Sequence, residues 1–187
     1  PAPQISRERA NQISDWKRGH VLVCLMSSHA DDDALFVSWA QQHPELRLLI
    51  VPRHPVRGSE IKTLADAQGV HASQVSVEIQ DKAQILIGDT FGDMGAYLSE
   101  SDVIAIGGSF SGKGGQNLIE PALMSKPLIA GPSMHNFQAI SAGLEAAGAL
   151  LRTDSEHLSQ SIDAAFETAQ VMGQAASAWV EANRGST

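Results

Sequence analysis

The amino-acid sequence predicts an α/β domain whose parallel sheet is Rossmann-like, doubly wound and covered by helices on both faces. Short apolar runs rich in Val, Ile and Leu alternate with longer stretches of helical periodicity, which is typical of buried parallel strands joined by crossover helices. A length of 187 residues, 43% of them hydrophobic and 18% charged, suits one domain with a full core. No internal repeat or low-complexity linker interrupts the pattern. We therefore expect a single domain over residues 1–187.

Seven apolar runs are expected to form the strands. Each is short, and glycine, proline or polar residues follow it. The runs cover residues 20–26, 46–51, 75–77, 84–87, 103–106, 127–130 and 149–151.

The segments between these runs have helical periodicity and are expected to cover the sheet. Residues 1–19 are interpreted as a linker and a first helix, and residues 155–183 as one long carboxyl-terminal helix. The predicted helices cover residues 6–17, 31–42, 57–68, 93–99, 117–124, 136–147 and 155–183.

Composition excludes several classes of function. Thirteen Lys and Arg against 21 Asp and Glu give a net charge of −8, which argues against nucleic acid or an anionic membrane surface as the main partner. Cys24 is the only cysteine and lies in an apolar run, so we expect a buried structural thiol and no disulfide framework or zinc cluster. No apolar run approaches the roughly 20 residues that a membrane span requires. The chain begins Pro-Ala-Pro, and we expect it to be a piece excised from a longer protein.

Polar and glycine-rich segments follow most of the predicted strands. Ligands of open α/β sheets bind outside the carboxyl ends of the strands, so these segments are the candidate binding edge. They are residues 27–29 (SSH), 52–55 (PRHP), 88–92 (GDTFG), 107–109 (GGS) and 131–133 (GPS).

The longest of these segments, GGSFSGKGGQNLIEP at residues 107–121, resembles a phosphate loop. It matches G-x-x-x-x-G-K up to Lys113, but Gly114 stands where a nucleoside triphosphatase has the Ser or Thr that binds magnesium. Glycine turns that lead into a helix near residue 117 can still offer backbone N–H groups and a helix dipole to one phosphate. The alternative is a flexible turn that binds nothing. The candidate residues here are Gly108, Ser109, Gly114, Gly115 and Asn117.

Three further side chains suit a nucleotide. Glu120 lies in the predicted helix after the glycine turn, where its carboxylate can accept both ribose hydroxyls; the alternative is a solvated helix glutamate. Arg53 and His54 lie between Pro52 and Pro55, which restrict the backbone so that both donors project toward an anionic leaving group. A surface turn is the alternative for this pair.

The loops after the first and fourth strands give weaker signals. Ser28 and His29 end the first strand, and the aspartates at 31–33 follow; helix capping explains these aspartates better than a metal site. In the loop at 88–94, Thr90, Phe91, Gly92 and Met94 can line a flat heterocycle, although a helix cap at Asp89 or Thr90 explains the same residues. A serine hydrolase is disfavoured because Ser109 and Ser111 lack the G-x-S-x-G elbow.

These segments, taken in order and spacing, resemble the carboxyl-terminal half of the Kdo transferases, the lipid A 3-deoxy-D-manno-octulosonic acid transferases of Gram-negative bacteria. The similarity runs from about residue 20 to 150, and Ser28 replaces the threonine of the Ser-Thr-His segment of the family. The matching segments are residues 51–55 (VPRHP), 88–92 (GDTFG), 107–110 (GGSF), 114–121 (GGQNLIEP), 131–132 (GP) and 136–137 (NF).

The resemblance implies a GT-B glycosyltransferase in which this half binds the donor CMP-Kdo and CMP is a product. It implies that Arg53 and His54 contact the donor phosphate together with the turn at 114–117, that Glu120 holds the ribose, and that the loop at 88–94 lines the cytosine. Ser28, His29, Gly108, Ser109 and Asn136 complete the implied donor site.

The resemblance also implies a metal-independent, inverting transfer with no cofactor and no catalytic residue in this chain. The catalytic base, the surface that binds the lipid A precursor and the membrane-associating surface belong to an amino-terminal half at the cytoplasmic face of the inner membrane. This chain alone is expected to be soluble and inactive. The alternatives are the donor domain of another GT-B enzyme, such as a UDP-sugar transferase or UDP-N-acetylglucosamine 2-epimerase, a P-loop-like nucleotide-binding module, or a non-catalytic nucleotide sensor.

Overall fold

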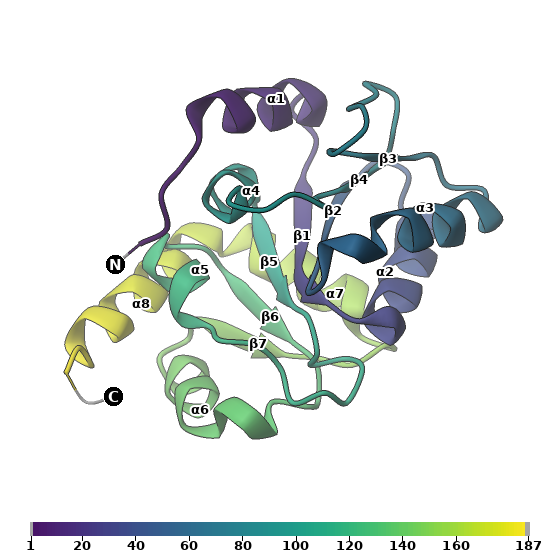
Figure 1. The fold of residues 1–187 in the computed structure, drawn as a ribbon. Coiled ribbons are helices and arrows are strands. Elements are labelled where there is room, and N and C mark those ends of the chain that lie inside the picture. The colour runs from purple at the N-terminus through teal and green to yellow at the C-terminus, as the bar shows by residue number, and fades with distance from the viewer. Residues whose placement is uncertain (1, 186–187) are drawn as a thin grey trace.

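The computed structural model describes residues 2–185, and residues 1, 186 and 187 of the predicted domain lie outside the described residues. Seven parallel strands form one sheet in the order β3-β4-β2-β1-β5-β6-β7 (Figure 1). This arrangement confirms the predicted doubly wound α/β fold. The strands are β1 (Leu22–Ser28), β2 (Arg47–Pro52), β3 (Ala72–Gln74), β4 (Ile85–Ile87), β5 (Val103–Ile106), β6 (Leu128–Ala130) and β7 (Leu150–Arg152).

Helices pack on both faces of the sheet and enclose two apolar clusters. Two short 3-10 helices, η1 (Pro55–Arg57) and η2 (His135–Phe137), lie in the connections. One face is covered by α1 (Arg7–Lys17), α4 (Met94–Glu100), α5 (Ile119–Leu123), α6 (Gln138–Ala146) and α8 (Ala169–Ala182). The other face is covered by α2 (Ala30–Gln42), α3 (Gly58–Ala67) and α7 (Leu158–Glu167).

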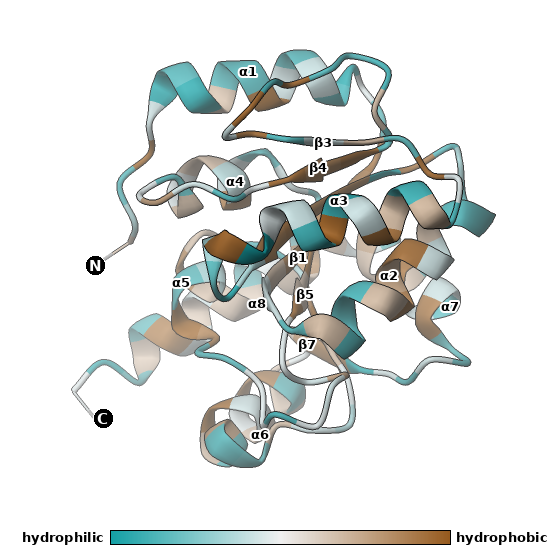
Figure 2. Ribbon diagram, turned by 45° about the vertical axis from the view of Figure 1, so that its right-hand side comes forward, coloured by the Kyte–Doolittle hydropathy of each residue, from teal (hydrophilic) through white to brown (hydrophobic). Residues whose placement is uncertain are grey.

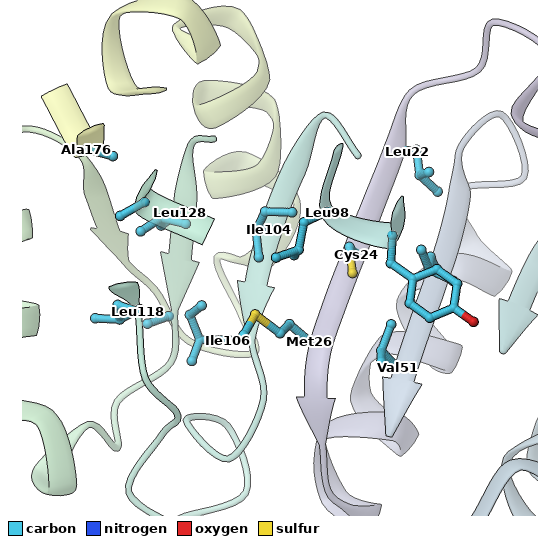
Figure 3. Packing of buried hydrophobic residues seen from close by; sticks show 14 of the residues in the cluster. Leu22, Cys24, Met26, Val51, Leu98, Ile104, Ile106, Leu118, Leu128 and Ala176 are labelled. Atoms are coloured by element: carbon cyan, nitrogen blue, oxygen red, sulfur yellow. The ribbon is translucent and has the colours of Figure 1, made fainter. Parts of the chain in front are cut away.

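The central strands are buried on both faces because helices cover each of them. Side chains of β1 alternate between the clusters: Cys24 and Met26 face one, and Val23 and Leu25 face the other. Hydrophobic residues accordingly dominate the strands in the interior (Figure 2). Cys24 and Met26 pack in the same layer as Ile104 and its neighbours on β5 (Figure 3).

The third strand lies three residues before its predicted position at 75–77. The apolar Val75 and Val77 suggest a strand, but the chain turns there: the N–H groups of Val77 and Glu78 donate to the Gln74 carbonyl at 3.0 and 2.9 Å. The Asp89 carboxylate holds this turn by accepting from the Ser76 backbone N–H at 2.9 Å. Val77 is therefore left 77% exposed, and β3 is Ala72–Gln74.

The single helix predicted over 155–183 is two helices, α7 and α8, which meet at Thr168. The φ and ψ angles of Thr168 are −111° and 22°, outside the helical range. Leu158 and Ile162 of α7 pack in the cluster on one face of the sheet, whereas Ala176 and Val180 of α8 pack in the cluster on the other. Met172 in the first turn of α8 still packs in the cluster of α7, so the chain crosses to the other face along α8, and the break at Thr168 lets both helices be buried.

No helix within residues 2–185 combines the length and the apolar character needed to cross a membrane. The other predicted helices agree with the structure except at their ends. The helix predicted from 117 begins at Ile119, and the helix predicted from 136 begins as η2 before α6.

Burial controls the chemistry of Cys24. Its side chain is fully buried, and desolvation of the thiolate raises the pKa of the thiol to about 12, although a hydrogen bond with Ser101 opposes the shift. We predict that the folded chain does not react with a chromogenic disulfide reagent at about pH 8, because the thiolate is the nucleophile. The chain unfolded in urea is the control and should release one equivalent of chromophore. Rapid stoichiometric reaction of the folded chain would contradict this burial.

Candidate functional site

The candidate site lies where the winding direction of the sheet reverses. From β1 the chain moves outward to β2, and after β4 it returns to place β5 on the other side of β1. The carboxyl ends of β1 and β5 therefore diverge into loops on opposite sides of a crevice, the position at which such sheets bind ligands. The loop after β2 borders the same crevice, because β2 also pairs with β1.

The buried carboxylate of Asp32 joins the first turn of α2 to the glycine loop after β5. Its Oδ2 accepts the backbone N–H groups of His29 at 2.9 Å and Gly108 at 2.8 Å, and the Ser111 hydroxyl at 3.1 Å. Its Oδ1 accepts the Phe110 N–H at 3.1 Å. Four donors thus satisfy one buried carboxylate, which is the condition for burying such a charge. The glycine loop is therefore held by α2.

Two glycines allow the backbone at this edge to approach closely. Ser27 has a φ of 55° where β1 bulges, and a Cβ on Gly107 would lie 2.3 Å from the Ser27 carbonyl oxygen. Gly114 has a φ of 91°, and a Cβ there would lie 2.3 Å from the Asn136 side-chain nitrogen. The Gly114 N–H donates to the Ser133 hydroxyl at 3.0 Å, which fixes the turn.

Three of the predicted donor-site residues line one cavity of about 430 Å³: Arg53, Asn117 and Glu120. The side-chain Oδ1 of Asn117 accepts a hydrogen bond from the Ile119 N–H at 3.0 Å, so the side-chain NH₂ group of Asn117 remains as a donor. Within residues 2–185, neither Arg53 nor Glu120 takes part in an ion pair. The cavity thus offers a guanidinium, an amide and a carboxylate to a ligand. Its remaining lining residues are Met26, Ser27, Gln116 and Ile119.

The helix beside this cavity is shorter than predicted. α5 contains five residues and begins at Ile119, so Asn117 precedes the helix, and its side-chain oxygen accepts the N–H of the first helical residue. A helix of one turn carries a small dipole. Positive charge in the cavity therefore comes mainly from Arg53.

His29 and His54 lie just beyond the cavity. They follow the strand ends that supply Ser27 and Arg53, and their ring centroids are 6.5 Å apart. Partial burial lowers the pKa of His29, and the positive charges of Lys113, Arg57 and His54 act in the same direction, whereas Asp32 opposes them. A neutral His29 imidazole can both donate and accept a hydrogen bond.

Arg57 links the loops after β1 and β2, and the sequence did not indicate this role. Its guanidinium pairs with the buried Asp33 carboxylate at 2.5 Å and donates to the Ser28 carbonyl at 3.3 Å. The same carbonyl accepts the Arg53 N–H at 3.0 Å. Burial raises the pKa of Asp33 to about 6, against the opposing effects of Ser28 and Arg57. Arg57 thereby orients the backbone that carries Arg53.

The three aspartates at 31–33 have separate surroundings. Asp31 is exposed, Asp32 binds the glycine loop and Asp33 pairs with Arg57. In the part of the chain that the structure describes, no group of three or more His, Cys, Asp or Glu side chains could hold a metal ion. Asp32 and Asp33 therefore have structural partners at this edge.

The predicted heterocycle loop at 88–94 lies outside the Arg53–Glu120 cavity. The Thr90 hydroxyl contacts the Asp93 carboxylate at 2.6 Å and the Tyr97 hydroxyl at 2.5 Å. Phe91 is 87% exposed and lines a separate cavity with Val56, whereas Met94 is half-buried against the core. Gly92 is exposed at the tip of the loop.

The remaining candidates, Ser109, Gly115 and Asn136, make contacts that hold the glycine loop after β5 in place. The fully buried Ser109 hydroxyl donates to the Ile106 carbonyl at 2.5 Å and accepts the Gly131 N–H at 2.8 Å. The Asn136 amide donates to the Lys113 carbonyl at 3.0 Å, and its own N–H donates to the Gly114 carbonyl at 3.2 Å. Gly115 is buried against Met134 in the same turn.

Comparison with known proteins identifies the relatives of this chain. No protein-family model matches it. In an alignment 183 residues long that covers 90% of this chain, it is 36% identical to a 3-deoxy-D-manno-octulosonic acid transferase of Bordetella pertussis. The chain is a homologue of the Kdo transferases. The resemblance inferred from the sequence is confirmed, and the chain spans 43% of the length of this relative.

Solved structures share the fold of this Kdo transferase homologue. The C-terminal CMP-Kdo binding domain of WaaA from Acinetobacter baumannii superposes with a TM-score of 0.79 and 23% identity, covering 94% of this chain and 95% of that one. Anabaena HepE in complex with UDP-glucose superposes with a TM-score of 0.62 and 15% identity, covering 95% of this chain and 48% of that one. The fold is that of the carboxyl-terminal domain of GT-B glycosyltransferases, as predicted.

The contacts of Asp32 predict a large effect of its removal. In Asp32→Ala, the buried Gly108 N–H and the partly buried N–H groups of His29 and Phe110 lose their acceptor, and we expect the free energy of unfolding to fall by about 3 kcal/mol. Urea denaturation followed by circular dichroism measures this change. We also expect faster amide hydrogen exchange at Gly108 and Phe110.

Asp31→Ala is the matched control, because Asp31 is exposed in the same helical turn. We expect it to lower the free energy of unfolding by less than about 1 kcal/mol, through lost interaction with the helix dipole. Equal effects of the two substitutions would show that the Asp32 contacts do not stabilise this edge.

Proposed function

We propose that this chain is the donor-binding half of a glycosyltransferase that transfers Kdo from CMP-Kdo to a lipid A precursor in lipopolysaccharide core biosynthesis. The observation that carries the proposal is the cavity in which Arg53, Asn117 and Glu120 meet, in a homologue of the Kdo transferases. The likeness of its fold to a domain described as CMP-Kdo binding supports the same donor.

The cavity suits a nucleoside monophosphate. Arg53 can offer parallel N–H donors to a phosphodiester, and the Asn117 amide adds a neutral donor. The Glu120 carboxylate carries two acceptor oxygens, which match two neighbouring ribose hydroxyls. We assign the cytosine to the side of the cavity nearest the loop at 88–94, with Met94 and Thr90 beside it.

The proposed transfer uses this half for the leaving group only. The acceptor hydroxyl oxygen forms a bond to the anomeric carbon of Kdo while the bond from that carbon to the phosphate oxygen breaks. Arg53 and His54 stabilise the negative charge that develops on the departing CMP. The hydroxyl proton passes to a base outside this chain, so the isolated chain is expected to bind donor without transferring Kdo.

The amino-terminal half is proposed to supply that base and the surface that binds the lipid A precursor. The relatives have more than twice the length of this chain, which leaves room for a second domain. We place the whole enzyme at the cytoplasmic face of the bacterial inner membrane, held there through the other half. The negative net charge of this half is compatible with a role away from anionic lipid.

A UDP-sugar donor is the alternative, because the similar HepE domain was solved with UDP-glucose. The two donors differ in base and in the number of phosphates. A P-loop-like triphosphatase is disfavoured, because Gly114 lacks the hydroxyl that binds magnesium.

Calorimetric titration with CMP tests the proposed function. We expect saturable binding, and in Glu120→Ala we expect binding to weaken at least about tenfold, because a carboxylate that accepts two hydroxyls is lost. Deoxy-CMP should bind the parent more weakly than CMP, and Glu120→Ala should reduce this difference. Arg53→Ala should weaken CMP but leave the affinity for cytidine unchanged.

Glu167→Ala is the control, since Glu167 is an exposed carboxylate on α7. The proposal fails if the parent shows no saturable binding of CMP, or if Glu120→Ala and Glu167→Ala both bind CMP as the parent does. Tighter binding of UMP or UDP than of CMP would favour the UDP-sugar alternative.

A further inference from the structure

Further hydrogen-bond donors, among them the Lys113 ammonium, lie next to the cavity in a chain whose net charge is −8. The cavity itself contains one cation, Arg53. Beyond it lie His29, His54 and Lys113, none of which lines the cavity. A nucleoside monophosphate bound through Arg53 and His54 would leave His29 and Lys113 unused.

The glycine loop and α2 hold these donors together. The His29 and Gly108 N–H groups share the Asp32 Oδ2 atom, at 2.9 and 2.8 Å. The Lys113 N–H in turn donates to the Gly108 carbonyl at 2.9 Å. The backbones of His29 and Lys113 are therefore joined through a short chain of hydrogen bonds, and the His54 ring lies 6.5 Å from the His29 ring.

The neighbouring carboxylates are occupied by other partners. Asp32 accepts four hydrogen bonds, and Asp33 pairs with Arg57, which also contacts Glu60 at 2.9 Å. For the Lys113 ammonium, the structure of residues 2–185 contains no acceptor or ion-pair partner. Its charge reaches His29, however, where it helps to lower the pKa of the imidazole.

The position of His29, His54 and Lys113 determines which part of a nucleotide sugar these side chains can contact. Ser27 and Arg53 line the cavity, and His29 and His54 follow them in the chain as the loops leave the cavity. A nucleotide whose ribose meets Glu120 and whose phosphate meets Arg53 would direct the group beyond its phosphate toward His29, His54 and Lys113. That group is the sugar.

We infer that His29 and Lys113, next to His54, form a second anion subsite, which binds the carboxylate of a sugar acid attached to the donor phosphate. This inference rests on the proposed function and specifies how its donor is selected. In an ulosonic acid the carboxylate is bonded directly to the anomeric carbon, beside the oxygen that joins the sugar to the phosphate. Its charge therefore lies close to the phosphate without requiring a longer site.

The subsite would separate sugar acids from neutral sugars. A carboxylate can accept hydrogen bonds from the Lys113 ammonium and from the His29 imidazole N–H. A neutral sugar would leave the ammonium without a counter-charge. Hydrogen bonds that involve a charged group are the stronger ones in proteins. Arg53 and His54 bind the phosphate, and His29 and Lys113 bind the carboxylate, so the site recognises a sugar donor that carries two separate negative charges.

Titration of the chain with CMP and with freshly prepared CMP-Kdo tests the inference. We expect the parent to bind CMP-Kdo more tightly than CMP. In Lys113→Ala we expect CMP-Kdo to bind about tenfold more weakly while CMP changes by less than about twofold, because the removed ammonium contacts only the sugar carboxylate. Lys62→Ala is the matched control, since the Lys62 ammonium is exposed on α3 and pairs with Asp66.

Proton NMR of the imidazoles adds a measurement that a purely structural role of Lys113 would not change. A bound carboxylate stabilises the imidazolium, so CMP-Kdo should raise the pKa of His29 more than CMP does. The corresponding signal of His157, which lies on the far loop before α7 and pairs with Asp154 at 2.7 Å, should not respond.

Several outcomes would overturn the inference, and they differ from failure of the proposed function. Equal affinity of the parent for CMP and CMP-Kdo, or equal weakening of both ligands in Lys113→Ala, would remove the carboxylate subsite while leaving CMP binding intact. If Lys113→Ala weakens CDP relative to CMP but does not affect CMP-Kdo, the donors bind a second phosphate and the inference is wrong. If the parent binds neither CMP nor CMP-Kdo, the proposed function fails and the inference fails with it.

Discussion

The buried carboxylate of Asp32 determines the geometry of the whole binding edge. It accepts hydrogen bonds from His29 in its own helix and from Gly108, which lies 76 residues further along the chain. Loss of either partner would lower the free energy of unfolding, because a buried carboxylate needs hydrogen-bond donors and a buried N–H group needs an acceptor. The loop after β5 is therefore positioned by the first turn of α2. Lys113 and Gly114 depend on that loop for their own positions.

The topology of the sheet explains why this contact occurs where it does. β1 is central and pairs with both β2 and β5, so the loops that follow these three strands emerge side by side. The end of β1 supplies Ser27 and is followed by His29. The loop after β2 supplies Arg53 and His54, and the loop after β5 leads to Glu120. Arg57 joins the first two loops through Asp33 and the Ser28 carbonyl, as Asp32 joins the first and third. Two buried aspartates in consecutive positions thus connect all three loops.

An acidic chain can still bind an anionic nucleotide because contact distances and long distances obey different rules. Exposed charges more than about 8–10 Å apart are largely screened at physiological salt, so the net charge of −8 has little effect inside a crevice. A guanidinium or ammonium in contact with a phosphate or carboxylate is screened much less. In a cavity lined by Arg53 and bordered by Lys113, the local donors outweigh the overall field. The same net charge disfavours an anionic membrane surface, because docking there would bring many surface carboxylates within a Debye length of the lipid headgroups.

Local patterns in the sequence predict the α/β class, six of the seven strands to within about two residues, and the edge of the sheet that carries the candidate site. The period of the apolar residues and the glycine, proline or polar residues that end each run are local properties of the sequence. Parallel strands place their carboxyl ends on one edge of the sheet whatever their order. Arg53, Asn117 and Glu120 were predicted on that edge and line one cavity there, and their role in binding a donor stays a prediction. Two features of the fold became clear only from tertiary contacts. The strand after α3 ends at Gln74, where Asp89 holds a turn. The last predicted helix is broken at Thr168, so that its two parts pack on different faces of the sheet. The tertiary structure also decided that Asp32 binds the glycine loop, that Asp33 pairs with Arg57, and that Thr90 and Ser109 have partners inside the protein. Each of these outcomes depends on which distant backbone or side chain satisfies a buried polar group, and no local pattern of residues encodes that partner.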